Sequence, residues 1–229
     1  MGTISIFRML IVLAAAMLCG SCAIPQTYHA TQHRTLSLGP DDLSRHGLAL
    51  ITPSTVTGQE EERQAVAITF TEVLYTHRPD ISIRALPQTL SAINRSGLDE
   101  QYTRMFEDYN KTGLFKLASL REVADATGVR YLGQLKLSGF TQGSDGRLSV
   151  FGLRVINTKQ ARIRLFLQIW DSTDGSIVWE GVDELQHCMD TVVEDAVTLK
   201  MVLEMASRHL IDQLPKQQEK TKTLNTSLK

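Results

Sequence analysis

The spacing of apolar residues changes from three or four positions to two along this chain of 229 residues, and that change restricts its fold more than any other feature. Residues 161–169 show the second spacing: Ala, Ile, Leu, Leu and Ile alternate with Arg, Arg, Phe and Gln. This is the pattern of strands with one buried face, and it recurs through residues 129–184. Turn-forming or polar residues at 142–146 and 157–160 are expected to separate the strands. The pattern predicts an antiparallel meander.

The first half of the chain repeats apolar residues at helical spacing instead. Residues 60–77 carry one apolar stripe, and Pro79 marks the end of that helix. Short apolar runs before and after it predict two strands. The same reasoning gives shorter helices in the middle of the chain and a long one near its end, over residues 87–96, 98–110, 119–127 and 190–214.

These elements together predict an α/β fold built on a single mixed sheet flanked by helices. A strand–helix–strand order in the first half suits parallel crossovers, and the second half supplies the antiparallel meander. We expect one domain over residues 46–214. Residues 22–45 lack clear periodicity and are predicted to be a flexible tether, and residues 215–229 a disordered polar tail.

The N-terminus carries an apolar segment that is too short to cross a membrane. Residues 9–18 are uncharged and follow a single positive charge, Arg8. Ten helical residues span about 15 Å, half of a bilayer core of roughly 30 Å. That length is typical of the apolar region of a secretory signal peptide, so residues 1–21 are predicted to be a signal peptide.

The residues that follow resemble a bacterial lipobox. The stretch Leu18-Cys19-Gly20-Ser21-Cys22 places small residues before a cysteine, although Cys19 stands where leucine is usual. The resemblance implies that the Ser21–Cys22 bond is cleaved and that Cys22 receives the lipid. The alternative is a plain secretory signal that leaves Cys22 as a thiol. Ala23 replaces the aspartate that often marks inner-membrane retention, which favours a periplasm-facing anchor in the outer membrane.

Charge and cysteine content exclude several other classes of protein. The chain has 24 Lys and Arg against 25 Asp and Glu, so no basic excess points to nucleic acid. With the signal removed and Cys22 acylated, Cys188 is the remaining thiol, which leaves no intramolecular disulfide and no cysteine-based zinc site. Cys188 is expected to be a buried small hydrophobe. His29 and His33 have i, i+4 spacing, but we interpret them as part of a solvated linker and predict no metal or cofactor.

The sequence contains no recognisable catalytic motif. A glycine-rich phosphate loop, HExxH and GxSxG are all missing. His187 adjoins Cys188, but neighbours in a strand point to opposite faces, which argues against a catalytic pair. Asp171 and Asp174 are expected to bond backbone amides of a turn. We therefore predict that the protein is not an enzyme, since action on envelope polymers would need a paired acid and base.

Two local patterns resemble those of a group of periplasmic lipoproteins. They are Tyr-Asn-Lys-Thr-Gly-Leu-Phe at 109–115, and Leu-Gln-Ile-Trp-Asp at 167–171 with the hairpin that returns through Trp179. The group comprises the curli-secretion lipoprotein CsgG, the penicillin-binding-protein activator LpoB and the N-terminal domain of TolB, and the resemblance covers roughly residues 46–212. It implies an α/β sandwich used for docking or assembly, with no catalytic residues to carry over.

The predicted function is therefore a membrane-anchored binding or assembly module for an envelope complex. Its periplasmic or outer-membrane protein partner is unknown, and it could form a homo-oligomer. The alternative is an oligomeric export or pore-associated lipoprotein of the curli-secretion type. A pore needs long amphipathic hairpins, whereas residues 133–170 supply two strands, one face of which carries Arg154, Lys159, Arg162 and Arg164. We expect the apolar face of 161–169 to pack against helices, and Arg162 and Arg164 to form either a basic recognition strip or a solvated face.

Overall fold

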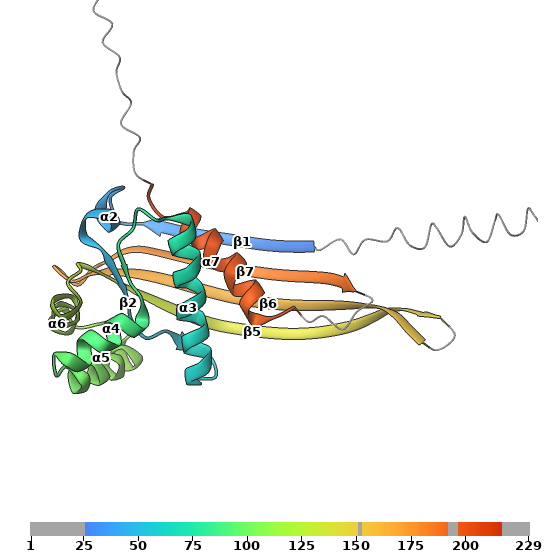
Figure 1. Ribbon diagram of the computed structural model, residues 1–229, viewed down its shortest axis with the longest axis horizontal. Helices are drawn as coiled ribbons and strands as arrows, with labels where there is room; N and C mark the ends of the chain where they lie inside the picture. Colours follow the sequence, from blue (N-terminus) through green and yellow to red (C-terminus); the bar gives the residue numbers. More distant parts are fainter. Residues whose placement is uncertain (1–25, 151–152, 192–196, 217–229) are drawn as a thin grey trace, which may run out of the picture.

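A seven-stranded mixed sheet organises the molecule (Figure 1). The computed structural model describes residues 26–150, 153–191 and 197–216. The strand order is β1-β7-β6-β5-β2-β4, and the short strand β3 pairs with β5. The pairs of β5 with β2 and β3 are parallel, and those of β5, β6, β7 and β1 are antiparallel, which confirms the predicted α/β fold. The strands are β1 (Gln26–Thr35), β2 (Leu48–Leu50), β3 (Ser54–Thr55), β4 (Ile83–Arg84), β5 (Tyr131–Val150), β6 (Leu153–Asp171) and β7 (Ile177–Thr191).

Helices cover the two faces of the sheet unequally. Helices α3 (Glu60–His77) and α7 (Leu199–Asp212) lie side by side on one face, where they bury the larger apolar core against β5, β6 and β7 (Figure 1). Helices α4 (Leu86–Arg95), α5 (Asp99–Thr112) and α6 (Leu117–Thr127) form a second, smaller core with β2 and the neighbouring ends of β5 and β6. Trp179 belongs to the first core and Trp170 to the second. None of the helices within the described ranges is both long enough and apolar enough to span a bilayer.

Strands β5 and β6 form one long hairpin. The sequence suggested breaks at 142–146 and 157–160, but both segments are paired, Gly143 with Gln160 and Gly146 with Asn157. Gly143 lies in a stretch of regular pairing, and register shifts occur at Leu137/Gly139, Gly146/Leu148 and Leu148/Ser149. The predicted breaks were wrong because pairing with a long partner strand overrides local turn propensity.

Strand β1 corrects the prediction of a flexible tether. Residues 26–35 pair along their whole length with β7, from Gln26 opposite Cys188 to Thr35 opposite Trp179. A short helix, α2 (Asp42–His46), then leads into β2. The polar sequence of β1 hides it from pattern analysis because an edge strand with little apolar cover needs no hydrophobic alternation.

The last helix of the domain is shorter than the sequence predicts. The helix predicted over 190–214 begins at Leu199, where the Thr198 hydroxyl accepts a hydrogen bond from the Met201 amide, and residues 190–191 belong to β7. The predicted signal peptide, Ser21 and Cys22 lie outside the described residues, as does the predicted tail from residue 217 onward.

Candidate functional site

The sheet face that turns away from α3 and α7 is the broadest candidate site, and we call it the outer face. Strand register places Tyr28, Gln186, Arg162 and Thr141 in one row across four strands. A second row two residues along contains Glu184 and Arg164, and a third contains Val182 and Phe166. These side chains are half-buried or exposed. The outer face consists of Tyr28, Gln32, Arg34, Lys136, Thr141, Arg162, Arg164, Phe166, Gln168, Glu180, Val182, Glu184 and Gln186.

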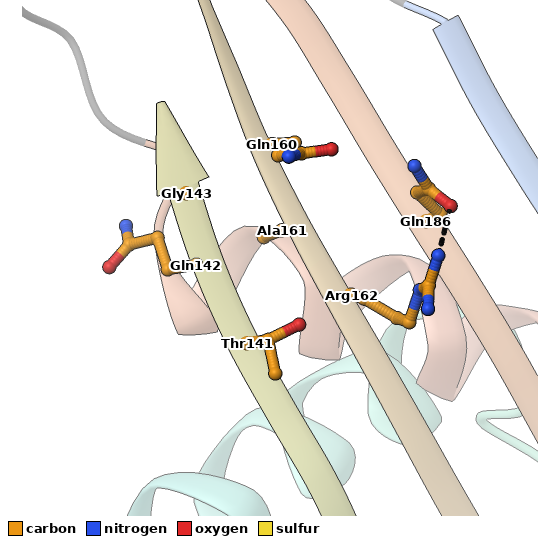
Figure 2. A pocket seen from close by; sticks show the side chains of 7 residues that line it. All are labelled: Thr141, Gln142, Gly143, Gln160, Ala161, Arg162 and Gln186. Carbon is orange, nitrogen blue, oxygen red and sulfur yellow. Dashed lines mark hydrogen bonds between the residues drawn. The ribbon is translucent and has the colours of Figure 1, made fainter. Parts of the chain in front are cut away.

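Polar side chains on the outer face are already oriented by their neighbours. Figure 2 shows the Arg162 guanidinium donating to Gln186 Oε1 at 2.9 Å, beside a shallow hollow of about 240 Å³. Arg164 Nε lies 2.8 Å from Glu184 Oε1, and its guanidinium stacks 5.0 Å from the centre of the Phe166 ring. A second hollow of about 300 Å³ lies over Phe166 and Val182. The arginines flagged in the sequence are therefore held in place, and Phe166 gives them an apolar centre.

Sequence reasoning identified part of this face and missed part. Arg162 and Arg164 lie on one face of β6, as expected, and both are exposed. This position agrees with either alternative raised for them, a recognition strip or a solvated face. Tyr28 was missed because β1 was not recognised as a strand, although its side chain is 64% exposed on the outer face. A long-range signal, the pairing of residues 26–35 with residues 179–188, would have been needed to find it.

The two aspartates of the Asp171–Ser176 turn are structural, as the sequence suggested. Asp171 Oδ1 accepts the Thr173 amide at 2.9 Å, and Asp174 Oδ1 accepts the Ser176 amide at 2.9 Å. Burial raises the pKa of Asp171, but hydrogen bonds from Arg130 and Thr173 outweigh it and lower the pKa overall. Hydrogen bonds from Ser176 lower the pKa of Asp174. Carboxyls held ionised in this way are suited to fixing a turn and unsuited to donating a proton at neutral pH.

His187 and Cys188 point to opposite faces, which confirms that they are not a pair. His187 lies on the inner face, the sheet face covered by α3 and α7, with its Nδ1 2.7 Å from the Thr27 hydroxyl, and burial lowers the pKa of its imidazole. Cys188 lies on the other face, where its Sγ accepts a hydrogen bond from Gln186 at 3.6 Å. The thiol was expected to be fully buried, but it is only half-buried because no core packs on that side.

A second polar cluster lies on the inner face, at the edge formed by β1. Asp183 of β7 is fully buried, and His29 of β1 and His209 of α7 both direct a ring nitrogen toward its carboxylate. The imidazole rings stack with their centroids 3.9 Å apart. His33, also on β1, stacks on Trp179 instead, with 6.2 Å between centroids. The two histidines flagged in the sequence are thus part of the folded sheet and have different partners.

Comparisons with known proteins reveal structural similarity without a sequence relative. No protein-family model matches the chain, and no curated protein sequence matches it. A PelC dodecamer structure from Paraburkholderia phytofirmans aligns with a TM-score of 0.48 and 11% identity, over 83% of this chain and 100% of that one. The LpoB C-terminal domain from Salmonella enterica aligns with a TM-score of 0.33 and 14% identity, over 63% and 93%. Lipoprotein GNA1162 from Neisseria meningitidis gives 0.33 and 10%, over 73% and 96%.

The sequence patterns had predicted a resemblance to LpoB, and LpoB is among these structures. All three alignments combine low identity with TM-scores below 0.5, so they assign neither a family nor a function. The function must be argued from the residues of this chain.

Proposed function

We propose that the protein is a lipid-anchored module of the cell envelope that binds a protein partner through the outer face of its sheet. The observation that carries this proposal is the composition of that face: arginines, glutamines and aromatic rings surround an apolar centre at Phe166 and Val182. Arginine, tyrosine and phenylalanine are enriched in protein interfaces, and a central pocket with a polar rim is typical of them. The hollow over Phe166 offers a place for one partner side chain.

The charges of the outer face favour a folded protein as the partner. Arg34, Lys136, Arg162 and Arg164 lie among Glu180 and Glu184, so both signs are present within one surface. A polyanion such as a nucleic acid would pair with the four cations but leave the two glutamates unmatched, whereas a protein surface can match both signs.

The proposed lipid at Cys22 would hold this surface close to a membrane. Only residues 23–25 separate Cys22 from the first residue of β1, and four Cα–Cα steps reach at most about 14 Å. Acyl chains contribute about 0.8 kcal/mol for each buried CH₂, so several chains anchor a domain firmly. The start of β1 would therefore lie close to the lipid headgroups, and the strand would run away from them.

A site-specific cross-linking experiment tests the binding face. A photoreactive amino acid replaces Phe166 in the full-length chain in intact cells, with matched positions at Val182 and at Tyr75, which is 51% exposed on α3 behind the inner face. We expect one discrete adduct of the same mass from 166 and 182, none from 75, and loss of that adduct when Arg162→Glu is added. Adducts of equal yield at 75, or none at 166 and 182, would contradict the proposal.

Metabolic labelling with palmitate tests the anchor. Cys22→Ser is expected to abolish labelling and to release the protein from membranes, while Cys19→Ser leaves both unchanged. If labelling persists in Cys22→Ser, the lipobox assignment is wrong. If the wild type and Cys22→Ser are both unlabelled and both soluble, the plain secretory signal is correct.

The long hairpin supports the second candidate, an oligomeric export or pore-associated lipoprotein. Strand β7 ends at Thr191 opposite Asn157, whereas β5 and β6 stay paired as far as Val150 and Leu153. The hairpin thus extends past its neighbours at the end of the sheet where β1 begins (Figure 1). The native mass of full-length protein in mild detergent separates the two candidates: a closed ring of many copies favours the export function, and a monomer or dimer favours the tethered binding module.

A further inference from the structure

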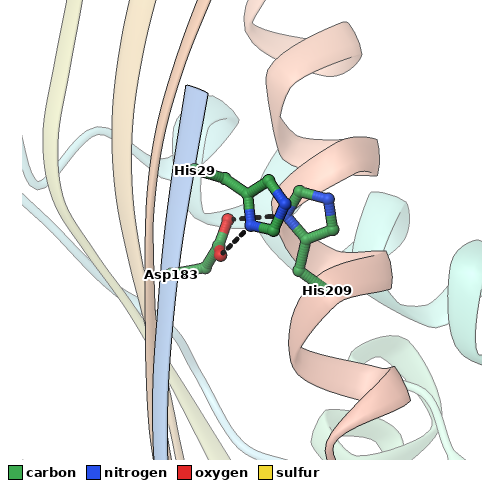
Figure 3. A group of neighbouring side chains, drawn as sticks. All are labelled: His29, Asp183 and His209. Carbon is green, nitrogen blue, oxygen red and sulfur yellow. Dashed lines mark hydrogen bonds and ion pairs between the residues drawn. The ribbon is translucent and has the colours of Figure 1, made fainter. Parts of the chain in front are cut away.

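Three side chains from three elements meet where the edge strand β1 lies against α7. Figure 3 shows His29 on β1 and His209 on α7 stacked together, both facing the carboxylate of Asp183 on β7. One ligand atom from each of the three lies within 4.8 Å of the other two. The sequence separates these residues widely, which is why His29 alone gave no sign of a site.

Asp183 is an unusual residue to find on the covered face of a sheet, one strand in from the edge. Its side chain is 0% exposed, on a face whose neighbours are Leu165 and Leu185. The Thr31 hydroxyl donates to its Oδ1 at 2.5 Å, and His209 Nδ1 lies 3.1 Å from its Oδ2. A buried carboxylate is costly unless hydrogen bonds and positive charge compensate it, and a bound cation beside the two histidines would supply that charge.

A protonated His209 alone explains only part of this arrangement. His29 Nδ1 is 3.9 Å from Asp183 Oδ1 and 3.4 Å from the Thr31 hydroxyl, so neither contact is a short hydrogen bond. The two imidazoles stack at 3.9 Å, and two imidazolium ions in that position would repel each other. Two neutral rings beside one carboxylate are the natural ligand set of a divalent cation.

We propose that His29, Asp183 and His209 bind a divalent transition-metal ion of the zinc class. Zinc takes imidazole nitrogen and carboxylate oxygen at about 2.0–2.2 Å in a tetrahedral arrangement, which sets neighbouring ligand atoms roughly 3.3 Å apart. His209 Nδ1 lies 3.1 Å from Asp183 Oδ2, close to that value. His29 Nδ1 lies 3.9 Å from the other oxygen, Oδ1, so a small rotation of the His29 ring would complete the set. Nitrogen-rich sites prefer zinc, copper or nickel to magnesium or calcium.

Two features of the surroundings suit a metal site. The Thr31 hydroxyl holds the carboxylate by a hydrogen bond, which is the usual outer-shell support for a ligating group. The His29 side chain is 48% exposed and that of His209 is 23% exposed, so an ion can enter from solvent and keep a water as its fourth ligand. Binding would fasten β1, which follows the proposed anchor, to α7 and the core.

Zinc titration of the full-length chain in mild detergent tests the proposal, with no histidine tag and with a chromophoric chelator as competitor. We expect one Zn²⁺ per chain and a rise in Tm on loading. Thr31→Val should weaken binding about 10–100-fold, as loss of an outer-shell partner does. His29→Asn and His209→Asn should each weaken it by more than that. His33→Asn is the matched control, because His33 shares the strand and the face but stacks on Trp179, and it should bind as the wild type does.

Metal-free Tm and circular dichroism establish that each variant is folded. The proposal is overturned if the wild type binds no stoichiometric zinc, or if His29→Asn and His209→Asn remain folded and bind zinc as tightly as the wild type. Equal weakening by His33→Asn would also overturn it, because the ion would then be held by exposed histidines in general. None of these results bears on the outer face, so the metal site and the binding function fail separately.

Discussion

The two faces of strand β6 share one backbone but differ sharply in burial. On the inner face Ala161, Ile163, Leu165, Leu167 and Ile169 are each at most 1% exposed beneath α3 and α7. On the outer face Arg162 and Arg164 are exposed, and Phe166 and Gln168 are half-buried. The inner residues hold the fold together, and the outer ones are free to contact a partner. The sheet therefore separates buried from accessible side chains at every second residue.

The same contrast runs along the length of the sheet. At the end near β2 both faces are covered, because Trp170 and Phe115 pack edge to face beneath α5 and α6. Toward the start of β1, the helices that the structure describes cover the inner face alone. Substitutions near Trp170 should thus be costly on both faces, whereas further along β6 the cost should depend on which face is changed.

A pair of adjacent truncations in β6 gives the largest expected difference. Leu167→Ala leaves a cavity in the larger core and is expected to lower the free energy of unfolding by about 2–5 kcal/mol. Phe166→Ala removes a larger side chain from the outer face and should cost less than about 1 kcal/mol. Urea denaturation measures both. Similar losses for the two variants would show that the outer face is also covered, in solution, by part of this chain or a second copy.

Added methyl groups sharpen the comparison from the opposite direction. A Cβ on Gly181 would lie 2.5 Å from the buried Trp179 ring and 3.2 Å from Leu210 of α7, so one of them must move. Gly181→Ala is expected to cost about 1–3 kcal/mol. Gly139→Ala is the control, because no heavy atom lies within 4 Å of its added methyl group. Thermal unfolding should show a lower Tm for Gly181→Ala alone. An equal drop in Tm for both variants would mean that the clash with Trp179 and Leu210 is not the cause of the destabilisation.

The sequence predicted the buried face of the sheet better than its exposed edge. Alternation over 161–169 correctly identified the inner face of β6, because burial on one side leaves a period of two. Strand β1 could not be found in this way, since Gln, Thr, His and Arg at a sheet edge carry no apolar period. The histidine cluster was missed for a related reason: Asp183 reaches His29 through the pairing of β7 with β1, and His209 through the packing of α7, and both are distant in the sequence. Glycines at 143 and 146 misled the turn prediction, because the hairpin pairs Gly143 regularly with Gln160 and continues past Gly146 through a register shift.

His187 provides a pH-dependent test of inner-face burial. Burial lowers its pKa below the ordinary 6.5, so the unfolded chain binds a proton more readily than the folded one. Its contribution to stability is complete above pH 6.5 and is lost as pH falls through the folded pKa, with a slope below about 1.4 kcal/mol per pH unit. His187→Asn should flatten the decline of unfolding free energy between pH 7 and 5, measured with a metal chelator present. An unchanged slope would mean that His187 is solvated.

Arg164→Ala is the smallest expected change in stability and the most direct separation of the two faces. Arg164 and Glu184 are 52% and 56% exposed in their ion pair, and such surface pairs contribute only about 0–1 kcal/mol. Urea denaturation should therefore show little change, and 0.5 M salt should reduce even that difference. The cross-linked adduct at residue 182 should nevertheless weaken, because Arg164 stacks on the Phe166 ring and carries the charge beside the hollow. A variant that unfolds easily yet keeps its adduct would reverse the assignment, making the outer face a structural surface.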